Sequence, residues 1–232
     1  MTNKQKFYLV FKRVSDFVLA VLLLIILSPI ILIAAIWVKL ESKGPIIFKQ
    51  KRPGKHKKIF TIYKFRSMRV EIEKDGRALS DEERMTTSGK VLRKTSIDEL
   101  PQLWNILKGE MSFIGPRPFL INDLGLYTEV QMIRFEVLPG ISSWTAIHGR
   151  ANLTYEEKFN YEIYYVKNIT LKIDLKIFFK TIWLVLSCKD VDDTVKKNKP
   201  RIGAKTIEVE TNSEVAVGIT GDDKLLATRR EV

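Results

Sequence analysis

Cysteine and histidine are scarce in this sequence. The 232-residue chain has one cysteine, Cys188, and two histidines. One cysteine cannot form a disulfide within the chain, and one cysteine with two histidines is too small a ligand set for a structural zinc site. These absences exclude disulfide-stapled secreted scaffolds and zinc-dependent folds, and they fit a reducing, cytosolic environment.

Acidic residues are also in the minority. The chain carries 39 Lys and Arg against 27 Asp and Glu, a formal net charge of +12. This excess predicts an anionic partner, which could be nucleic acid, anionic lipid or a phosphorylated substrate. The length allows one large domain or two small ones.

Charge is absent from the 22 residues Phe17–Val38. As one straight helix they would measure about 33 Å, which is enough to cross a bilayer core of about 30 Å. However, Ser28 and Pro29 interrupt the run, and both flanks are basic, whereas a spanning helix usually shows a Lys and Arg asymmetry. We therefore predict a broken helix that enters and leaves by the cytoplasmic face, with a kinked span as the alternative.

The segment Lys49–Arg69 has nine Lys or Arg residues and no acid. A polybasic segment next to a membrane can simply lie on anionic lipid. Within it, the alternation of Ile59–Phe65 predicts a strand, on which Lys64 and Arg66 share one face. Such a face could instead bind phosphate or RNA.

The segment Thr95–Pro118 is the most informative stretch. Its apolar residues recur at helical spacing, and Pro101 is tolerated only in a first turn, which places Asp98 and Glu99 at a helix N-terminus. Free N–H groups and the helix dipole favour negative charge there, so the two acids could be capping residues or catalytic ones, and Ser96 with Glu99 three residues later also fits a capping box. Gly109 is expected to end the helix.

Arginines accompany this acid pair. Arg117 lies between two prolines, a stiff arrangement that would hold its guanidinium in place, and the other candidates are Arg66, Arg93 and Arg150. Guanidinium groups bind phosphates bidentately, and carboxylates beside phosphates can hold Mg²⁺. An ionised aspartate can also attack phosphorus and form a covalent intermediate.

The second half of the chain predicts three helices, at Asn122–Val137, Tyr155–Val166 and Leu171–Leu186. The last is apolar over most of its surface, so it could lie in a membrane interface or in the core. We expect an α+β, mostly helical fold divided into a re-entrant membrane helix hairpin (1–40), a catalytic domain on the cytoplasmic face (41–190) and a peripheral or disordered tail (191–232).

Five motifs in order and in register identify a resemblance. The chain resembles the small monotopic phosphoglycosyl transferases, also called polyprenyl-phosphate hexose-1-phosphate transferases or bacterial sugar transferases, over roughly residues 5–190. The motifs are Ser28-Pro29, KFRSM at 64–68, DELPQL at 98–103, GPRP at 115–118 and PGI at 139–141.

The resemblance implies a fold, a reaction and roles. It implies a re-entrant helix broken at Ser28-Pro29 and amphipathic interfacial helices around a small catalytic core, at the cytoplasmic face of the bacterial inner membrane. A sugar 1-phosphate would pass from a UDP-sugar to undecaprenyl phosphate, releasing UMP, as the first membrane step of glycan, capsule or exopolysaccharide synthesis. Asp98 would be the nucleophile, close to Mg²⁺, and Glu99 its partner. The phosphate and nucleotide contacts would be Arg93, Arg117 and Arg150, with Lys64 and Arg66 as weaker candidates.

The sequence departs from the family pattern after Pro139, where it reads PGISSWTAI instead of PGITGWAQ. Sugar recognition near Ser143 and Thr145 is therefore open, as is the identity of the sugar. Membrane lipids and downstream glycosyltransferases are the other expected partners, and nucleic acid is not expected. The alternative function is a membrane-anchored basic module that binds nucleic acid or a regulatory partner and would tolerate loss of Asp98.

Overall fold

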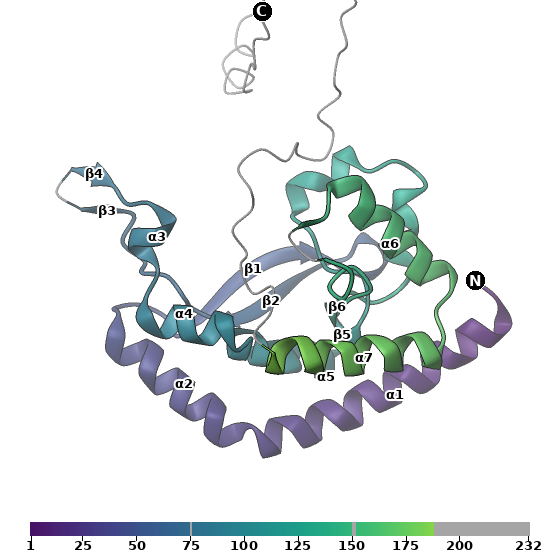
Figure 1. The fold of residues 1–232 in the computed structure, drawn as a ribbon, viewed down its shortest axis with the longest axis horizontal. Coiled ribbons are helices and arrows are strands. Elements are labelled where there is room, and N and C mark those ends of the chain that lie inside the picture. Colours follow the sequence, from purple (N-terminus) through teal and green to yellow (C-terminus); the bar gives the residue numbers. More distant parts are fainter. Residues whose placement is uncertain (75, 150–151, 188–232) are drawn as a thin grey trace, which may run out of the picture.

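The fold is α+β and mostly helical, as predicted. The computed structural model describes residues 1–74, 76–149 and 152–187 (Figure 1). In Figure 1 the long bent pair α1–α2 runs beneath the rest of the molecule, and α7 lies parallel to part of it. Arg150, Cys188 and the predicted tail lie outside the described residues.

Short elements follow the bent pair α1 (Asn3–Ile26) and α2 (Ser28–Glu41). The two antiparallel sheets are β1–β2 and β3–β4, and β5 pairs with β6 in parallel. In chain order the elements, with η for 3₁₀ helices, are β1 (Ile47–Pro53), η1 (Lys55–Lys57), β2 (Ile59–Phe65), β3 (Glu73–Lys74), β4 (Arg77–Ala78), α3 (Asp81–Arg84), α4 (Thr87–Lys94), η2 (Ile97–Gln102), α5 (Leu103–Lys108), β5 (Ser112–Ile114), η3 (Ile121–Leu126), η4 (Gln131–Glu136), β6 (Gly140–Ser142), α6 (Tyr155–Lys167) and α7 (Leu171–Leu186).

The break between α1 and α2 is a local consequence of sequence. Pro29 has no N–H to give the carbonyl of Ile25, four residues earlier. The hydroxyl of Ser28 donates to that carbonyl instead, at 2.8 Å. The two helix axes differ by 64°, so the predicted break is confirmed. Among the described residues neither helix alone has the length and hydropathy of a membrane span, although the bent pair passes that test together.

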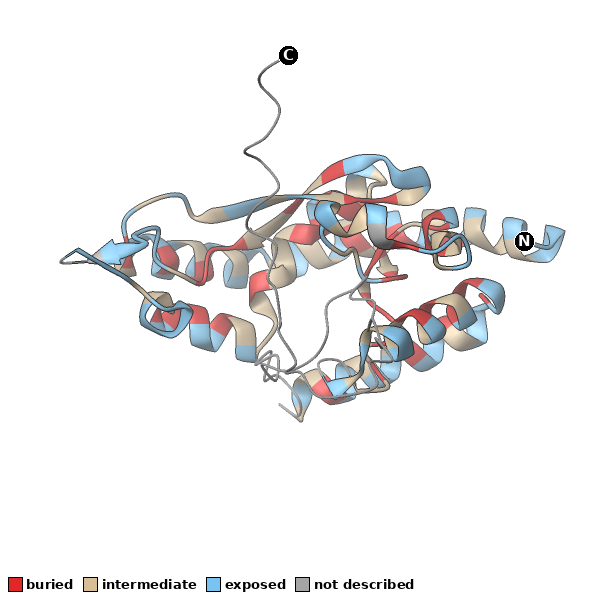
Figure 2. Cartoon of the chain, turned by 90° about the horizontal axis from the view of Figure 1, so that it is seen from above, coloured by how far each residue is buried: buried red, intermediate tan, exposed pale blue. Residues whose placement is uncertain are grey.

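Each long helix buries only a narrow stripe. In α1 the buried residues are Lys12, Asp16 and Ala20, which repeat every four positions. In Figure 2, buried and exposed positions alternate along the helices. The exposed positions include many large apolar residues: Phe7, Phe11, Phe17, Leu22, Ile25 and Ile26 on α1, Ile33, Trp37 and Leu40 on α2, and Phe179, Trp183 and Leu186 on α7. The helix α7 therefore buries one face in the core and exposes another apolar face.

The polar stripe of α1 attaches the bent pair to the rest of the protein. Lys12 Nζ lies 2.8 Å from Asp174 Oδ2 on α7. The guanidinium of Arg13 donates to the carbonyls of Ile106 and Leu107 in the last turn of α5, at 2.6 and 2.9 Å. These contacts join α1 to the C-terminal end of α5, so α1 is held along one side by the folded body.

Two glycines let the GPRP and PGI motifs lie side by side. A Cβ on Gly115 would lie 2.3 Å from the carbonyl oxygen of Leu138, and one on Gly140 would lie 2.1 Å from the nitrogen of Gly115. The backbones touch because neither residue has a side chain. The parallel pairing of β5 with β6 depends on this contact.

The helix predicted over Asn122–Val137 is wrong. The segment forms η3 and η4, which are separated by residues 127–130, beginning with the extended residue Tyr127. Tyr127 and Phe135 are buried against Phe159 of α6, and Arg134 is buried among them. One continuous helix would direct these side chains along a single stripe, whereas the two short helices wrap them around one aromatic cluster.

Candidate active site

A cavity of about 1600 Å³ is lined by both apolar and charged residues. Its apolar lining includes Leu23 and Leu27 at the α1–α2 bend and Val185 near the end of α7. Its charged lining is Lys49, Arg52, Lys64, Arg66, Arg69, Arg84, Arg93, Asp98, Glu99, Arg117, Lys158 and Glu162. The cavity therefore joins an apolar region beside the helix bend to a strongly cationic one.

Asp98 lies in η2 and faces this cavity. Only 8% of the residue is exposed, yet its carboxylate accepts no hydrogen bond from the described residues. Burial raises its pKa to about 6, with Glu99 adding to the effect and Lys64, Arg93 and Arg117 opposing it. A buried carboxylate without donors is available to react or to bind a cation.

Helix capping does not explain these acids. Ser96, which the sequence suggested as a cap, has a left-handed backbone (φ 58°) and makes no side-chain capping bond. The helix begins as the 3₁₀ turn η2, with Pro101 inside it, and continues as α5 until Gly109, which has the expected positive φ of 78°. The helix and its end were predicted correctly, while the capping role of Ser96 was not observed.

Glu99 brings two cations to the side of Asp98. Its Oε1 atom lies 2.6 Å from Lys64 Nζ on β2 and 3.4 Å from Arg117 Nη2 in the GPRP loop. Arg93, in the last turn of α4, donates from Nε to Ser67 Oγ at 2.9 Å. Three cations and two acids, from four separate segments, therefore meet where the sequence predicted one site.

Arg66 is engaged elsewhere. Its buried guanidinium donates to the carbonyl and hydroxyl of Ser42, at 2.7 and 2.8 Å, and to the carbonyl of Lys43. These acceptors end α2, so the geometry favours a structural role in closing that helix. Phosphate binding by Arg66 stays a prediction that these contacts do not support, and Arg150 lies outside the described residues.

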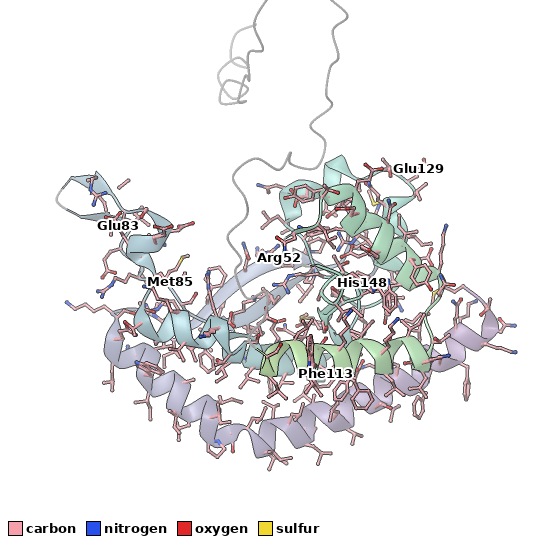
Figure 3. The ribbon with its side chains drawn as sticks, viewed as in Figure 1. Arg52, Glu83, Met85, Phe113, Glu129 and His148 are labelled. Carbon is pink, nitrogen blue, oxygen red and sulfur yellow. The ribbon has the colours of Figure 1, made fainter. Side chains whose placement is uncertain are left out.

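Arg52, on β1, lines the cavity but was not among the predicted site residues. Its guanidinium donates to Gln50 Oε1 at 2.6 Å and to the carbonyl of Pro118 at 3.3 Å. Burial lowers the pKa of Arg52, and the nearby charge of Arg117 lowers it further. Figure 3 shows Arg52 near the middle of the molecule, by the strands β1 and β2. The feature that could have identified Arg52 is the register of the β1–β2 hairpin. Because Phe48 pairs with Lys64, Arg52 and Lys64 lie on one face of the hairpin.

The departure from the family pattern lies in the cavity wall. Ser142, Ser143 and Thr145 all line the cavity and are buried. Ser142 Oγ lies 2.6 Å from Thr181 Oγ1, and Ser143 Oγ accepts the N–H of Ala146 at 3.0 Å. The hydroxyl of Thr145 has no hydrogen-bond partner among the described residues.

The carboxylates of this site can be compared with the ligands that Mg²⁺ prefers. Within residues 1–74, 76–149 and 152–187 no group of three or more His, Cys, Asp or Glu side chains could hold a metal ion. Mg²⁺, however, is commonly held by one or two carboxylates, with substrate phosphates and water completing six ligands. The donor-free carboxylate of Asp98, with Glu99 next to it, fits that mode.

Comparison with known proteins gives one consistent result. A protein-family model described as bacterial sugar transferase matches residues 7–188. The chain is 46% identical over 186 residues to the uncharacterized sugar transferase EpsL of Bacillus subtilis, covering 80% of this chain and 92% of EpsL.

Two relatives are named for a specific reaction. The UDP-N-acetylgalactosamine-undecaprenyl-phosphate N-acetylgalactosaminephosphotransferase of Aeromonas hydrophila is 43% identical, over 78% of this chain and 44% of that protein. The UDP-glucose:undecaprenyl-phosphate glucose-1-phosphate transferase of Klebsiella pneumoniae is 40% identical, over 75% and 40%. The chain thus spans less than half the length of these two. It belongs to the bacterial sugar transferase family, and it is an enzyme of the phosphoglycosyl transferase type.

Proposed function

We propose that this protein transfers a sugar 1-phosphate from a UDP-sugar to a polyprenyl phosphate such as undecaprenyl phosphate, through a covalent intermediate on Asp98. The observation that carries the proposal is the carboxylate of Asp98, which is buried, lines the cavity and accepts no hydrogen bond from the described residues, with Lys64, Arg93 and Arg117 around it. The names of two relatives support the substrate classes.

The first step exchanges one bond at phosphorus. An oxygen of Asp98 bonds to the sugar-bearing phosphorus of the UDP-sugar, the bond from that phosphorus to the bridging oxygen breaks, and UMP leaves with that oxygen. Arg93, Arg117 and Lys64 provide positive charge where negative charge spreads over the transferring group. Arg52, beside Arg117, is placed to bind the departing nucleotide phosphate.

The second step transfers the phosphosugar from Asp98 to the lipid substrate. An oxygen of the polyprenyl phosphate bonds to the same phosphorus, and the carboxylate of Asp98 leaves, which regenerates the enzyme and releases a polyprenyl diphosphate sugar. A bound Mg²⁺, which Asp98 and the adjacent Glu99 would hold, supplies charge neutralisation at the phosphates. A covalent step lets a soluble and a lipid substrate use one site in turn.

The bent helix pair supports a monotopic placement on the cytoplasmic face of the bacterial inner membrane. Both α1 and α2 expose wide apolar faces, while the N-terminal half of α1 is tied to α5 and α7 by Arg13 and Lys12. The apolar cavity lining near Leu23 and Leu27 would accept the prenyl chain. Cysteine labelling of both ends should find each on the cytoplasmic side, and a periplasmic N-terminus would contradict a re-entrant pair.

Trapping the intermediate tests the reaction. Purified protein is incubated with Mg²⁺ and a panel of UDP-sugars, without polyprenyl phosphate. With the right sugar, UMP should appear in an amount close to the amount of enzyme, and the intact protein should gain the mass of one sugar phosphate. The Glu83→Gln variant changes an exposed side chain that does not line the cavity and that Figure 3 shows on the arm apart from Arg52, so it should behave as wild type. Adduct formation that persists in Asp98→Asn would contradict the proposed nucleophile.

A further inference from the structure

A second charged pair lies next to the cavity, and it is more deeply buried than the first. Arg134 Nη2 on η4 lies 3.1 Å from Glu162 Oε2 on α6, and the two side chains are 3% and 2% exposed. A buried ion pair usually gives little net stability compared with apolar side chains of the same volume. Its presence here therefore calls for a reason other than stability.

Both members of the pair bind the main chain of Arg117. Glu162 Oε1 accepts the N–H of Arg117 at 3.2 Å, and the guanidinium of Arg134 donates to the carbonyl of Arg117. Pro116 and Pro118 have no N–H, so the amide of Arg117 is the one main-chain donor that this Pro-Arg-Pro stretch can offer. The pair thus holds the residue from both of its peptide groups.

Aromatic rings fix Arg134 in turn. Its guanidinium carbon lies 4.1 Å from the centre of the Phe119 ring and between 5.5 and 5.8 Å from the rings of Tyr127, Phe135 and Phe159. The hydroxyl of Tyr127 also accepts a hydrogen bond from Arg134 at 3.1 Å. A guanidinium held by several cation–π contacts has little freedom to rotate. The wrapping of η3 and η4 that the sequence did not predict is what builds this enclosure.

We propose that Arg134 and Glu162 are positioning residues, which anchor the backbone of Arg117 so that its guanidinium stays in the cavity next to Glu99. The inference rests on the proposed function, in which Arg117 binds the phosphates of the UDP-sugar. Arg117 has a long side chain, and a shift of about 1 Å in such a group can cost about a hundredfold in rate. A stiff proline loop alone fixes the backbone angles, whereas the buried pair fixes where the loop lies.

A double-mutant cycle tests the proposal. The apolar pair Arg134→Met with Glu162→Leu keeps the side-chain volume but leaves the N–H and the carbonyl of Arg117 without these partners, so it should fold and melt several degrees below wild type. We expect its kcat/KM for UMP release to fall about tenfold. In the Arg117→Ala background, the same pair should lower kcat/KM by less than about twofold, because the side chain that it positions is already gone.

A matched control uses another buried ion pair. Lys12→Met with Asp174→Leu removes a buried ion pair between α1 and α7, away from Arg117. Its effect on kcat/KM should be the same with and without Arg117→Ala. If the protein with the apolar Arg134 and Glu162 substitutions fails to fold, the variant Glu162→Gln replaces it in the double-mutant cycle with Arg117→Ala. This change removes the charge of Glu162 and keeps the shape of its side chain.

The outcomes separate the two claims. An Arg117→Ala enzyme with unchanged kcat/KM would overturn the role of Arg117 in the proposed function. An Arg117→Ala enzyme that is impaired, but in which changes at Arg134 and Glu162 cause an equal further loss, would overturn positioning and leave the proposed function standing.

Discussion

Asp98 and Asp174 are both buried aspartates, 8% and 5% exposed, with opposite surroundings. Asp174 accepts hydrogen bonds from the hydroxyls of Tyr8 and Tyr165, at 2.7 and 2.8 Å, and pairs with Lys12. Asp98 accepts none from the described residues. A buried carboxylate whose oxygens are satisfied holds elements together, whereas one left without donors destabilises the fold and is available for chemistry.

The largest expected effect is from Asp98→Asn. UMP release should fall at least about a thousandfold, because the nucleophile is lost. The variant should also be more stable than wild type at pH 7, by about 2–3 kcal/mol, because a pKa raised to about 6 means that folding disfavours the ionised carboxylate. UMP assays and thermal melts measure both, and a less stable variant would contradict the comparison.

Removal of Mg²⁺ should have the next largest effect. Chelation with EDTA should lower turnover by about a hundredfold, since a metal typically provides several kcal/mol of charge stabilisation to phosphoryl transfer. The melting temperature should not change, because the metal would be held by Asp98, Glu99 and substrate rather than by a closed set of protein ligands. Activity that survives chelation would argue against the metal.

Acidic pH should reduce activity through Asp98. Its carboxyl has a pKa of about 6, raised by burial, so the ionised fraction should fall about tenfold between pH 7 and pH 5. Stability should change with pH in the opposite direction to activity. Between about pH 4 and 6 the carboxyl of Asp98 is protonated in the native state and ionised in the unfolded state, so the native state loses stability as pH rises through that window. UMP burst rates without polyprenyl phosphate measure the activity, because no lipid phosphate then titrates.

The smallest effect on chemistry should come from Asp174→Asn. This change breaks the pairing with Lys12 and leaves α1 less firmly attached to α7, so the melting temperature should fall by several degrees. The activity of the folded fraction should stay within about threefold of wild type. Glu83→Gln on the exposed arm is the control and should change neither quantity. A loss of activity as large as that of Asp98→Asn would erase the distinction between the two aspartates.

Local features were predictable wherever neighbours along the chain decide them. The break at Ser28-Pro29, the strand Ile59–Phe65 and the helix end at Gly109 follow from a missing N–H, an alternating pattern and a positive φ. The meeting of Asp98 with Arg117 was inferred from family motifs, because nothing in their spacing brings them together.

The sequence by itself determined the bent apolar helix pair, the acidic helix start and the proline-bound arginine, because each depends on a few adjacent residues. Only the tertiary structure decided that Arg52 joins the site, that Arg66 closes the end of α2, and that Arg134 and Glu162 hold Arg117. Those contacts join residues from 17 to 66 positions apart, through strand register and aromatic packing. No local sequence pattern predicts these contacts, because a hydrogen bond to a backbone carbonyl does not require a periodic arrangement of residue types.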